Sequence, residues 1–422
     1  MQYFQADLYI FSMLEKNLDC IVRSPRLQRD ELLKFVYRPV FRHVMYDHWT
    51  SPPFSTNLAA ISGIIRGLKI EDDPYIISLR EQLSAAQHGT TEYFRIDRKL
   101  SATLMNQKTF TLKGLRDFER AAFDILVDIG PWAADWYVWR IIEKAKEAIN
   151  PYNNIMRTWN PTEKNNLVKI LSPIVLTPVS YHVDDIMSDS SDKVQSLVTL
   201  LLNEKFETEE RGDIYSCLIF VQRRDSVIAL AEVLKNHPFT TNIFRIGILL
   251  GVSDSSHRQS FLDITRKLPR DSQEDTLADF RSGDLNLIVA TAVAEEGLDI
   301  QACGSVIRWD LPQNMASWAQ SRGRARKKSS TFTLMFARGS QSRQDVEKWE
   351  NLERKMIEMY NDPLRVQAAE YDPTMGMNDY QEEDEVFVVE STGYVLSHST
   401  LTRRLISRLK ARSVVFIPLS LI

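Results

Sequence analysis

The sequence predicts an α/β protein with a parallel sheet, preceded by an all-helical region and followed by the start of a small α+β segment. Three observations predict this. Short apolar runs alternate with amphipathic helices from residue 176 onward, which is the pattern of a parallel sheet with crossover helices. Before that point the apolar spacing is helical throughout, with no strand-like alternation. After residue 387 a strand pattern and one helix pattern follow an acidic stretch.

Residues 1–175 are predicted to be a helical bundle. Residues 57–68 place four aliphatic side chains at the spacing of one helix face. The same spacing recurs at residues 31–37, 121–129 and 132–149. Prolines fall between these runs, where breaks between helices belong.

Residues 176–340 are predicted to form the parallel sheet and its helices. Continuous apolar runs, typical of strands buried on both faces, occur at residues 217–221, 244–250, 285–290, 305–309 and 331–336. Helices are expected at residues 192–201, 225–235 and 276–282. Asp192 is the expected N-cap of the first, with Gln195 in the capping-box position, and Gly283 is expected to stop the third. In such a sheet we expect functional loops at the carboxyl ends of the strands.

The remaining residues divide into three stretches. A long charged helix is expected within residues 341–370, and an acidic linker, which contains Glu382-Glu-Asp-Glu385, within residues 371–386. A strand and a helix within residues 387–422 cannot bury their own apolar faces. We therefore expect this last segment to be a domain that is cut short.

Composition narrows the class of protein. Of 422 residues, 44% are hydrophobic and 26% charged, which is typical of a globular protein, and the net charge is −4. This balance argues against a surface that is basic throughout, but it is compatible with a local basic groove. Three widely spaced cysteines predict neither a zinc site nor a disulfide framework. No apolar run reaches the ~20 residues that span a bilayer. We expect no membrane partner and a cytoplasmic protein, with a nuclear location left open.

The first candidate site is the loop after the third strand, Thr291-Ala-Val-Ala-Glu-Glu-Gly-Leu-Asp299. A threonine hydroxyl and exposed backbone amides at a strand end can hold a phosphate. Gly297 permits close backbone approach, and Asp299 can accept a hydrogen bond from a ribose hydroxyl or orient an arginine. Taken alone, the loop would also fit an ordinary strand-to-helix turn.

The second candidate site is an arginine cluster, Gln320-Ser-Arg-Gly-Arg-Ala-Arg326, followed by two lysines. Guanidinium groups neutralise the charge that develops in phosphoryl transfer, and they also grip nucleic-acid backbones. An exposed basic turn is the simpler alternative for this cluster by itself.

Together these segments resemble a known motor. Residues 217–224, 288–299 and 320–326 are similar to motifs IV, V and VI of superfamily 2 helicases, in that order. Motif VI has the form found in Dicer proteins and antiviral RNA sensors. The chain most closely resembles fungal Dicer-like proteins, of the antiviral type that acts in RNA silencing.

The resemblance implies a fold for each part. Residues 176–340 would be the second, RecA-like lobe of the helicase. Residues 1–175 would be the helical insertion domain, together with a residual connection to the lobe. Residues 387–393 resemble the start of a Dicer dimerisation domain.

The resemblance also implies roles for individual residues. In the family, ATP is hydrolysed between two RecA-like lobes that grip double-stranded RNA. Carried over, Gln320, Arg324 and Arg326 would act on the ATP phosphates. Gly297 and Asp299 would line the nucleotide cleft. The residues expected to contact RNA are Gln222, Arg223, Thr291, Glu296 and Arg322.

Motifs of the other half of an ATP site do not occur in the sequence. There is no GxxxxGK[ST] phosphate loop, and neither Asp30-Glu31 nor Asp384-Glu385 continues as a DExH motif. An RNase III carboxylate signature is not found either. We therefore expect the chain alone to be catalytically incomplete. It would share ATP with a first lobe supplied in cis or in trans, and would hold neither Mg²⁺ nor another metal by itself.

Two other functions stay open at this stage. The chain could be a non-catalytic module that binds duplex RNA or regulates Dicer-like proteins. It could also be a fragment of another superfamily 2 helicase, including one directed to DNA. ATP turnover separates the first alternative from an enzyme, and competition between duplex RNA and duplex DNA tests the second.

Overall fold

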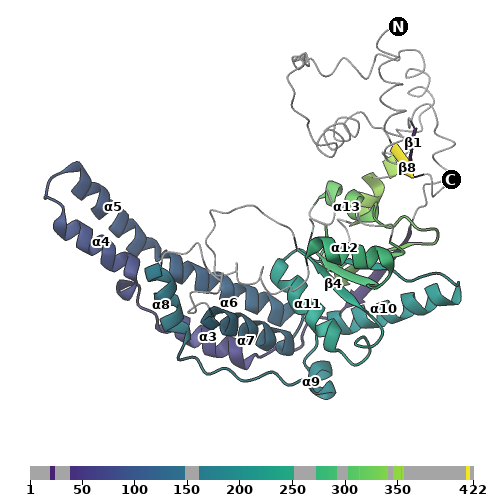
Figure 1. Ribbon diagram of the computed structural model, residues 1–422, viewed down its shortest axis with the longest axis horizontal. Coiled ribbons are helices and arrows are strands. Elements are labelled where there is room, and N and C mark those ends of the chain that lie inside the picture. Colours follow the sequence, from purple (N-terminus) through teal and green to yellow (C-terminus); the bar gives the residue numbers. More distant parts are fainter. Residues whose placement is uncertain are drawn as a thin grey trace, which may run out of the picture. The chain divides into compact units, whose positions relative to one another are not determined.

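The structure is a computed structural model of the 422-residue chain. It describes residues 20–23, 39–147, 161–250, 272–291, 303–312, 314–340, 346–352, 354–355 and 415–418. The chain divides into two compact units. One is Pro39–Ser342, and the other comprises Met1–Arg38 together with Arg343–Ile422. Figure 1 labels their elements.

The larger unit is built on a six-stranded parallel sheet with strand order β2-β7-β6-β3-β5-β4. The strands are β2 (Val40–Tyr46), β3 (Cys217–Phe220), β4 (Ile246–Leu249), β5 (Leu287–Ala290), β6 (Ser305–Arg308) and β7 (Thr331–Ala337). Every residue of β3, β5 and β6 is buried, as expected for central strands covered on both faces. The predicted RecA-like α/β fold is confirmed.

Helices cover the sheet. They are α10 (Asp192–Glu210), α11 (Arg224–Asn236), α12 (Gln273–Ser282) and α13 (Met315–Arg322). Helix α12 ends at Gly283, as predicted, and that glycine has the left-handed φ of 88°. The expected cap of α10 was wrong by one residue. Ser191, not Asp192, accepts the hydrogen bond from the Val194 amide, and Gln195 donates to the Met187 carbonyl instead of closing a capping box.

A helical region precedes α10 in the same unit. Its elements are α3 (Thr56–Gly67), η1 (Ile70–Asp72), α4 (Pro74–Ala85), α5 (Thr91–Asn106), α6 (Phe110–Asp128), α7 (Pro131–Glu147), α8 (Pro161–Leu171) and α9 (Val183–Ser188). The predicted helices at residues 57–68, 121–129 and 132–149 correspond to α3, the end of α6, and α7. The side chains of Ser55, Asp73, Thr90 and Thr109 cap four of these helices.

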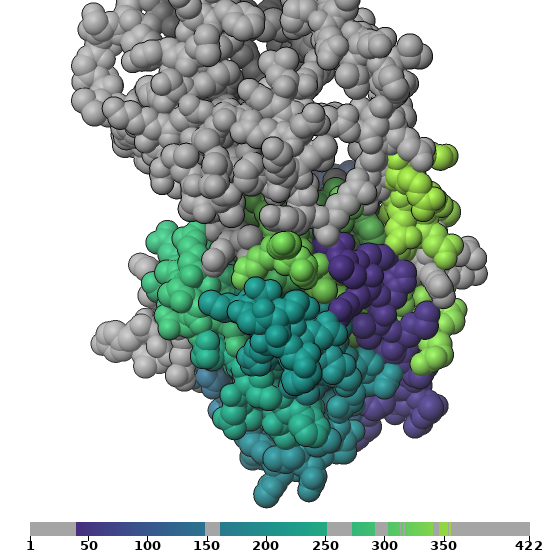
Figure 2. Space-filling view, turned by 90° about the vertical axis from the view of Figure 1, so that its right-hand side faces the viewer, coloured from purple at the N-terminus to yellow at the C-terminus, as the bar shows by residue number. Residues whose placement is uncertain are grey.

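The expectation of helices alone before residue 175 was wrong at residues 40–46. These residues form β2, the edge strand of the sheet, which pairs in parallel with β7. In the space-filling view the purple segment that contains β2 adjoins light-green residues of the sheet lobe (Figure 2). An edge strand is exposed on one side, so β2 lacks the continuous apolar run of a central strand. Its partner also lies nearly 300 residues away in sequence, beyond any local signal.

Helix α11 joins the two parts of the larger unit. It contacts β4 and β5 of the sheet, and it also contacts α6 and α7 of the helical region. Its residues Val227, Leu230, Ala231 and Leu234 are fully buried in the core that both parts share. The helical region is therefore packed directly on the sheet lobe.

The smaller unit contains an antiparallel pair, β1 (Cys20–Arg23) with β8 (Val415–Pro418). Strand β1 is a second departure from the all-helical expectation for residues 1–175. Residues 346–352 and 354–355 are helical, in line with the predicted charged helix. The helix expected at residues 31–37 and the acidic linker lie outside the described residues. The same holds for the segment 387–422, in which a strand and a helix are expected, except for residues 415–418.

Candidate nucleotide and nucleic-acid interface

Three of the residues expected to contact RNA lie at the edge where the strands end. Gln222 and Arg223 follow β3, and Thr291 follows β5. The Gln222 amide donates to Asp310 Oδ2 at 2.6 Å, and Thr291 is buried with its amide donating to the Leu249 carbonyl at 3.1 Å. Parallel strands bring their carboxyl ends to one edge, which is why these separated motifs converge.

Arg223 is held by two carboxylates at this edge. Its Nη1 atom donates to Asp124 on α6, and its Nη2 atom lies 3.7 Å from Asp225 Oδ2. Asp225 in turn accepts a hydrogen bond of 2.9 Å from the Tyr137 hydroxyl on α7. Burial raises the pKa of Asp225, although the Tyr137 hydrogen bond and the Arg223 charge oppose that rise. Arg223 therefore bridges the sheet lobe and the helical region.

A cavity of about 280 Å³ opens beside this arginine. Its lining comes from α6, from the residues that follow β3 and β6, and from the first turn of α11: Phe123, Asp124, Val127, Asp128, Gln222, Arg223, Ser226 and Asp310. Among its charged groups, Asp128 and Asp310 both form ion pairs with Lys193, at 2.6 and 3.9 Å from its Nζ atom. The cavity thus places Arg223 and Asp124 at an open surface between the two parts of the unit.

Lys193 is a buried cation between α6 and the carboxyl edge of the sheet. Its Nζ atom lies 2.6 Å from Asp128 Oδ1, 3.9 Å from Asp310 Oδ1 and 4.1 Å from the centre of the Trp309 ring. Burial lowers the pKa of Lys193, but the charges of Asp128 and Asp310 together with Tyr46 outweigh it and the pKa is raised. The ammonium group therefore stays charged and fixes α6 against the carboxyl edge of the sheet.

The arginine cluster lies at the opposite edge of the sheet from the carboxyl strand ends, where functional loops are expected. Helix α13 carries Gln320 and Arg322 and runs back to the edge where β6 and β7 begin. There the Arg324 carbonyl accepts a hydrogen bond of 3.2 Å from the Cys303 amide. Ala325 forms an isolated parallel β-bridge with Cys303. A crossover helix between parallel strands must return to the starting edge, which explains the position of its C-terminal residues.

The turn that bears Arg324 and Arg326 is braced by several bonds. Arg326 Nε donates to the Gly323 carbonyl at 2.6 Å, and Lys327 Nζ donates to Ser216 Oγ at 2.9 Å. Burial raises the pKa of the Cys303 thiol to about 12, although the nearby charges of Lys327, Arg324 and Arg326 oppose it. Cys303 is therefore a core thiol, and the basic groups gather around the start of β6.

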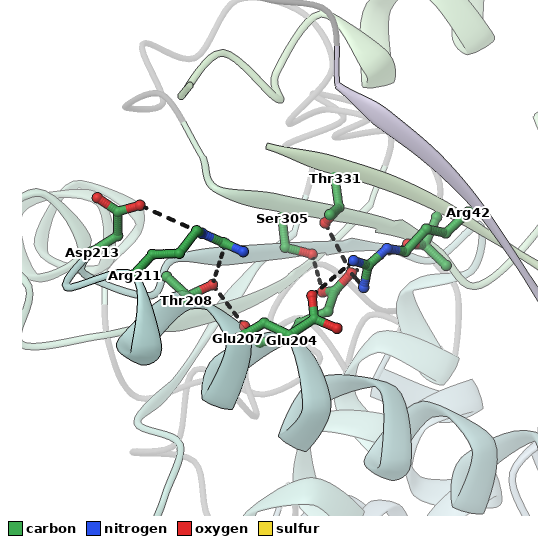
Figure 3. A network of polar contacts seen from close by, with 9 residues as sticks. Arg42, Glu204, Glu207, Thr208, Arg211, Asp213, Ser305 and Thr331 are labelled. Carbon is green, nitrogen blue, oxygen red and sulfur yellow. Dashed lines mark hydrogen bonds and ion pairs between the residues drawn. The ribbon is translucent and has the colours of Figure 1, made fainter. Parts of the chain in front are cut away.

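A buried carboxylate stabilises the same edge from inside (Figure 3). Glu204 on α10 accepts hydrogen bonds from Ser305, which begins β6, and from Thr331, which begins β7, the latter at 2.8 Å. Arg42 of β2 lies 3.9 Å from Glu204 and donates to Glu207 at 2.7 Å. Burial raises the pKa of Glu204, with the Ser305 and Thr331 hydrogen bonds opposing. The network fixes the two strands between which the arginine turn lies.

The predicted site residues are thus divided. Gln222, Arg223 and Thr291 share one edge of the sheet, whereas Arg322 lies with Gln320, Arg324 and Arg326 near the other. Glu296, Gly297 and Asp299 lie outside the described residues. The sequence reasoning missed Asp124, Lys193, Glu204 and Asp310. Of these, only Asp310 could have been found from the sequence, because it is an acidic residue directly after a predicted strand. Asp124, Lys193 and Glu204 lie on helices, where a charged residue is usually exposed to solvent.

Among the described residues, no three histidine, cysteine or acidic side chains are grouped so that they could hold a metal ion. No described helix is both long and apolar enough to cross a membrane.

Comparison with known proteins identifies a helicase domain in the chain. The family described as "Helicase conserved C-terminal domain" matches residues 192–328. Dicer-like protein 2 of Aspergillus fumigatus is 36% identical over 84% of this chain and 24% of its own length. Dicer-like protein 2 of Neosartorya fischeri is 36% identical over 91% of this chain and 26% of its own length. The chain is a Dicer-like helicase region.

This Dicer-like region spans about a quarter of the length of the curated relatives that it matches. The relatives' alignments cover the helical region as well as the sheet lobe, because they extend far beyond residues 192–328. Among solved structures, the Pyrococcus furiosus Hef helicase domain matches 76% of this chain and 59% of that chain, at 15% identity and a TM-score of 0.34. That score is too low to bear on the arrangement of parts.

Proposed function

We propose that this chain is the C-terminal half of an ATP-dependent RNA helicase motor that grips double-stranded RNA and completes an ATP site on a first RecA-like lobe. The observation that carries the proposal is the braced arginine turn at the starting edge of β6 and β7. Transition-state charge is stabilised best by donors whose positions are fixed before the reaction. A turn tied to Ser216, Cys303 and Gly323 meets that requirement.

In this proposal the two edges of the sheet have separate tasks. Arg324 and Arg326, with Gln320, approach the ATP phosphates as arginine fingers do. Gln222, Arg223 and Thr291 contact the RNA backbone at the other edge. Gly297, Asp299 and Glu296 complete the nucleotide and RNA contacts in the family pattern. The phosphate loop and the Mg²⁺ ligands come from the first lobe, in cis or in trans.

The first experiment measures ATP hydrolysis by the purified 422-residue chain, with and without duplex RNA, beside direct binding of duplex RNA and duplex DNA. We expect RNA binding with preference over DNA, and no turnover. RNA-stimulated turnover by the chain alone would contradict the half-motor. Preference for duplex DNA would favour a different superfamily 2 helicase.

A second experiment tests the arginines in a protein that also contains the first lobe. Arg324→Ala and Arg326→Ala should each leave the fold intact and reduce ATP hydrolysis by about 10³-fold or more. Lys328→Ala, an exposed basic neighbour in the same turn, is the matched control. Full activity in either arginine variant would remove the role assigned to that residue. RNA binding without turnover even in the two-lobe protein would favour the non-catalytic RNA-binding or regulatory module.

A further inference from the structure

The contact between Arg223 and Asp124 joins a residue of the proposed RNA-binding set to the helical region. Arg223 follows β3 at the carboxyl edge of the sheet, and Asp124 lies on α6. The guanidinium group donates directly to the Asp124 carboxylate. A carboxylate presents two oxygens to arginine much as a phosphate does, so one ligand at this position excludes the other.

Two aspartates of α6 form ion pairs with the sheet lobe, and the two pairs differ in how deeply they are buried. Asp128, one helical turn after Asp124, is bound to Lys193, whose side chain is only 5% exposed. Asp124 and Arg223, by contrast, have exposed side-chain fractions of 41% and 37%. Asp128 therefore holds α6 in place, while the pair formed by Asp124 can open without unpacking the core.

The surroundings of Arg223 leave room for a phosphate once Asp124 is displaced, although Asp128 and Asp310 also line the cavity. Asp225 lies 3.7 Å from the second guanidinium nitrogen, and its carboxylate is fixed by the Tyr137 hydroxyl. Asp225 thus pairs with Nη2 of the arginine, while Asp124 pairs with Nη1. The cavity of about 280 Å³, which Arg223 and Ser226 line together with Asp124, provides open space beside this pair.

We propose that Asp124 occupies the position of an RNA phosphate on Arg223, so that duplex RNA must displace this carboxylate of the helical region before it can engage the sheet lobe. The proposal rests on the proposed function, because it takes Arg223 as an RNA contact. The helical region then acts as a built-in competitor that lowers RNA affinity at rest. Conversely, RNA on the lobe releases one of its links to α6.

The test is binding of a short blunt duplex RNA to the 422-residue chain and its variants over about 50–200 mM salt. Asp124→Asn should tighten binding by about fivefold, because a half-exposed ion pair is a modest competitor. The slope of log K against log salt should stay the same, because Arg223 contacts a phosphate in the complex of either chain. A purely structural ion pair would leave the affinity itself unchanged.

Four variants serve as controls. Asp117→Asn removes the same charge from α6 two turns away, and should change affinity by less than about twofold because the charge is screened. Asp124→Glu keeps the competing carboxylate and should stay near the wild-type affinity. Arg223→Ala should weaken RNA binding. The double variant Arg223→Ala/Asp124→Asn should bind no more tightly than Arg223→Ala. Thermal unfolding midpoints identify any variant whose fold is disturbed.

The outcomes distinguish this inference from the proposed function. If Asp124→Asn behaves like Asp117→Asn while Arg223→Ala still weakens binding, the competitor role is wrong and the RNA-binding function stands. If Arg223→Ala binds RNA as the wild type does, Asp124 has nothing to compete for and the inference is overturned. Failure of every variant, including the wild type, to bind RNA would overturn both.

Discussion

At the scale of single residues, the most consequential group is the buried carboxyl of Glu204. Burial raises its pKa in the folded chain above the ordinary value of 4.5, with the hydrogen bonds from Ser305 and Thr331 opposing. The folded state then binds a proton more tightly than the unfolded state does. Protonation of Glu204 therefore stabilises the folded state. This contribution is fully present below the pKa of Glu204 in the unfolded chain, and it is lost as the pH rises through the higher pKa in the folded chain.

Glu204→Gln should remove this pH dependence. The amide oxygen can still accept a hydrogen bond, but it does not titrate. The free energy of unfolding of the wild type, measured in urea at a series of pH values, should therefore fall relative to that of Glu204→Gln as the pH rises above about 4.5. Glu207→Gln, on the same helix and partly exposed, controls for the loss of one charge. Equal behaviour of the two variants would contradict the prediction.

Single residues also show where sequence reasoning ends. Arg223, Arg324 and Arg326 stood out because they belong to motifs with fixed order. Asp124 and Lys193 occur on amphipathic helices at positions that look like solvated charges. Their roles depend on which helix packs against which strand end, and that is a property of the tertiary structure. A local sequence pattern cannot predict this packing.

At the scale of elements, the junction between α6 and α7 requires glycine. Gly130 has a φ of 139°, and a Cβ there would overlap the carbonyl oxygen of Asp189. Gly130→Ala should therefore destabilise the chain by about 2–4 kcal/mol. Gly63 offers a matched control, because it lies inside α3 with nothing within 4 Å of its Cβ position. Gly63→Ala should stabilise by up to about 1 kcal/mol. Urea denaturation measures both, and equal effects would contradict the assignment.

The start of α10 gives a second prediction for an element. Ser191 caps the helix through the Val194 amide, and its hydroxyl donates to the Asp128 carbonyl at 2.8 Å. Ser191→Ala should cost about 1–2 kcal/mol, because a buried cap and a link to α6 are lost together. Asp192→Ala, at the position that sequence favoured, should cost about 0.5 kcal/mol or less. The reverse order in thermal or urea unfolding would show that Asp192 is the working cap.

The elements that could be predicted from sequence share one property. Central strands such as β3 and β5 are continuous apolar runs, since helices cover both faces, and that signal is local. The edge strand β2 has an exposed side and pairs with β7 across the whole intervening chain. The fold class could therefore be predicted from the central strands of the sheet. The edge strand β2 could be identified only from the structure.

At the scale of the whole unit, the ion-pair centre at Lys193 holds the helical region and the sheet lobe together. It connects Asp128 of α6, Asp310 after β6 and Tyr46 at the end of β2. Removing a buried cation leaves its partner carboxylates uncompensated, which is costly even where the intact pair contributes little. This side chain should therefore contribute strongly to the contact between the two parts, beside that of α11.

Lys193→Met should destabilise the chain by about 3–5 kcal/mol and loosen the link between the two parts. Lys205→Met removes a cation from the same helix at a surface pair with Glu209, and should cost about 1 kcal/mol or less. Unfolding followed by tryptophan fluorescence, to which Trp309 beside Lys193 contributes as one of eight tryptophans, should no longer coincide with far-ultraviolet circular dichroism in Lys193→Met. If the two probes still coincide and the loss matches that of Lys205→Met, other contacts, such as those of α11, hold the two parts together.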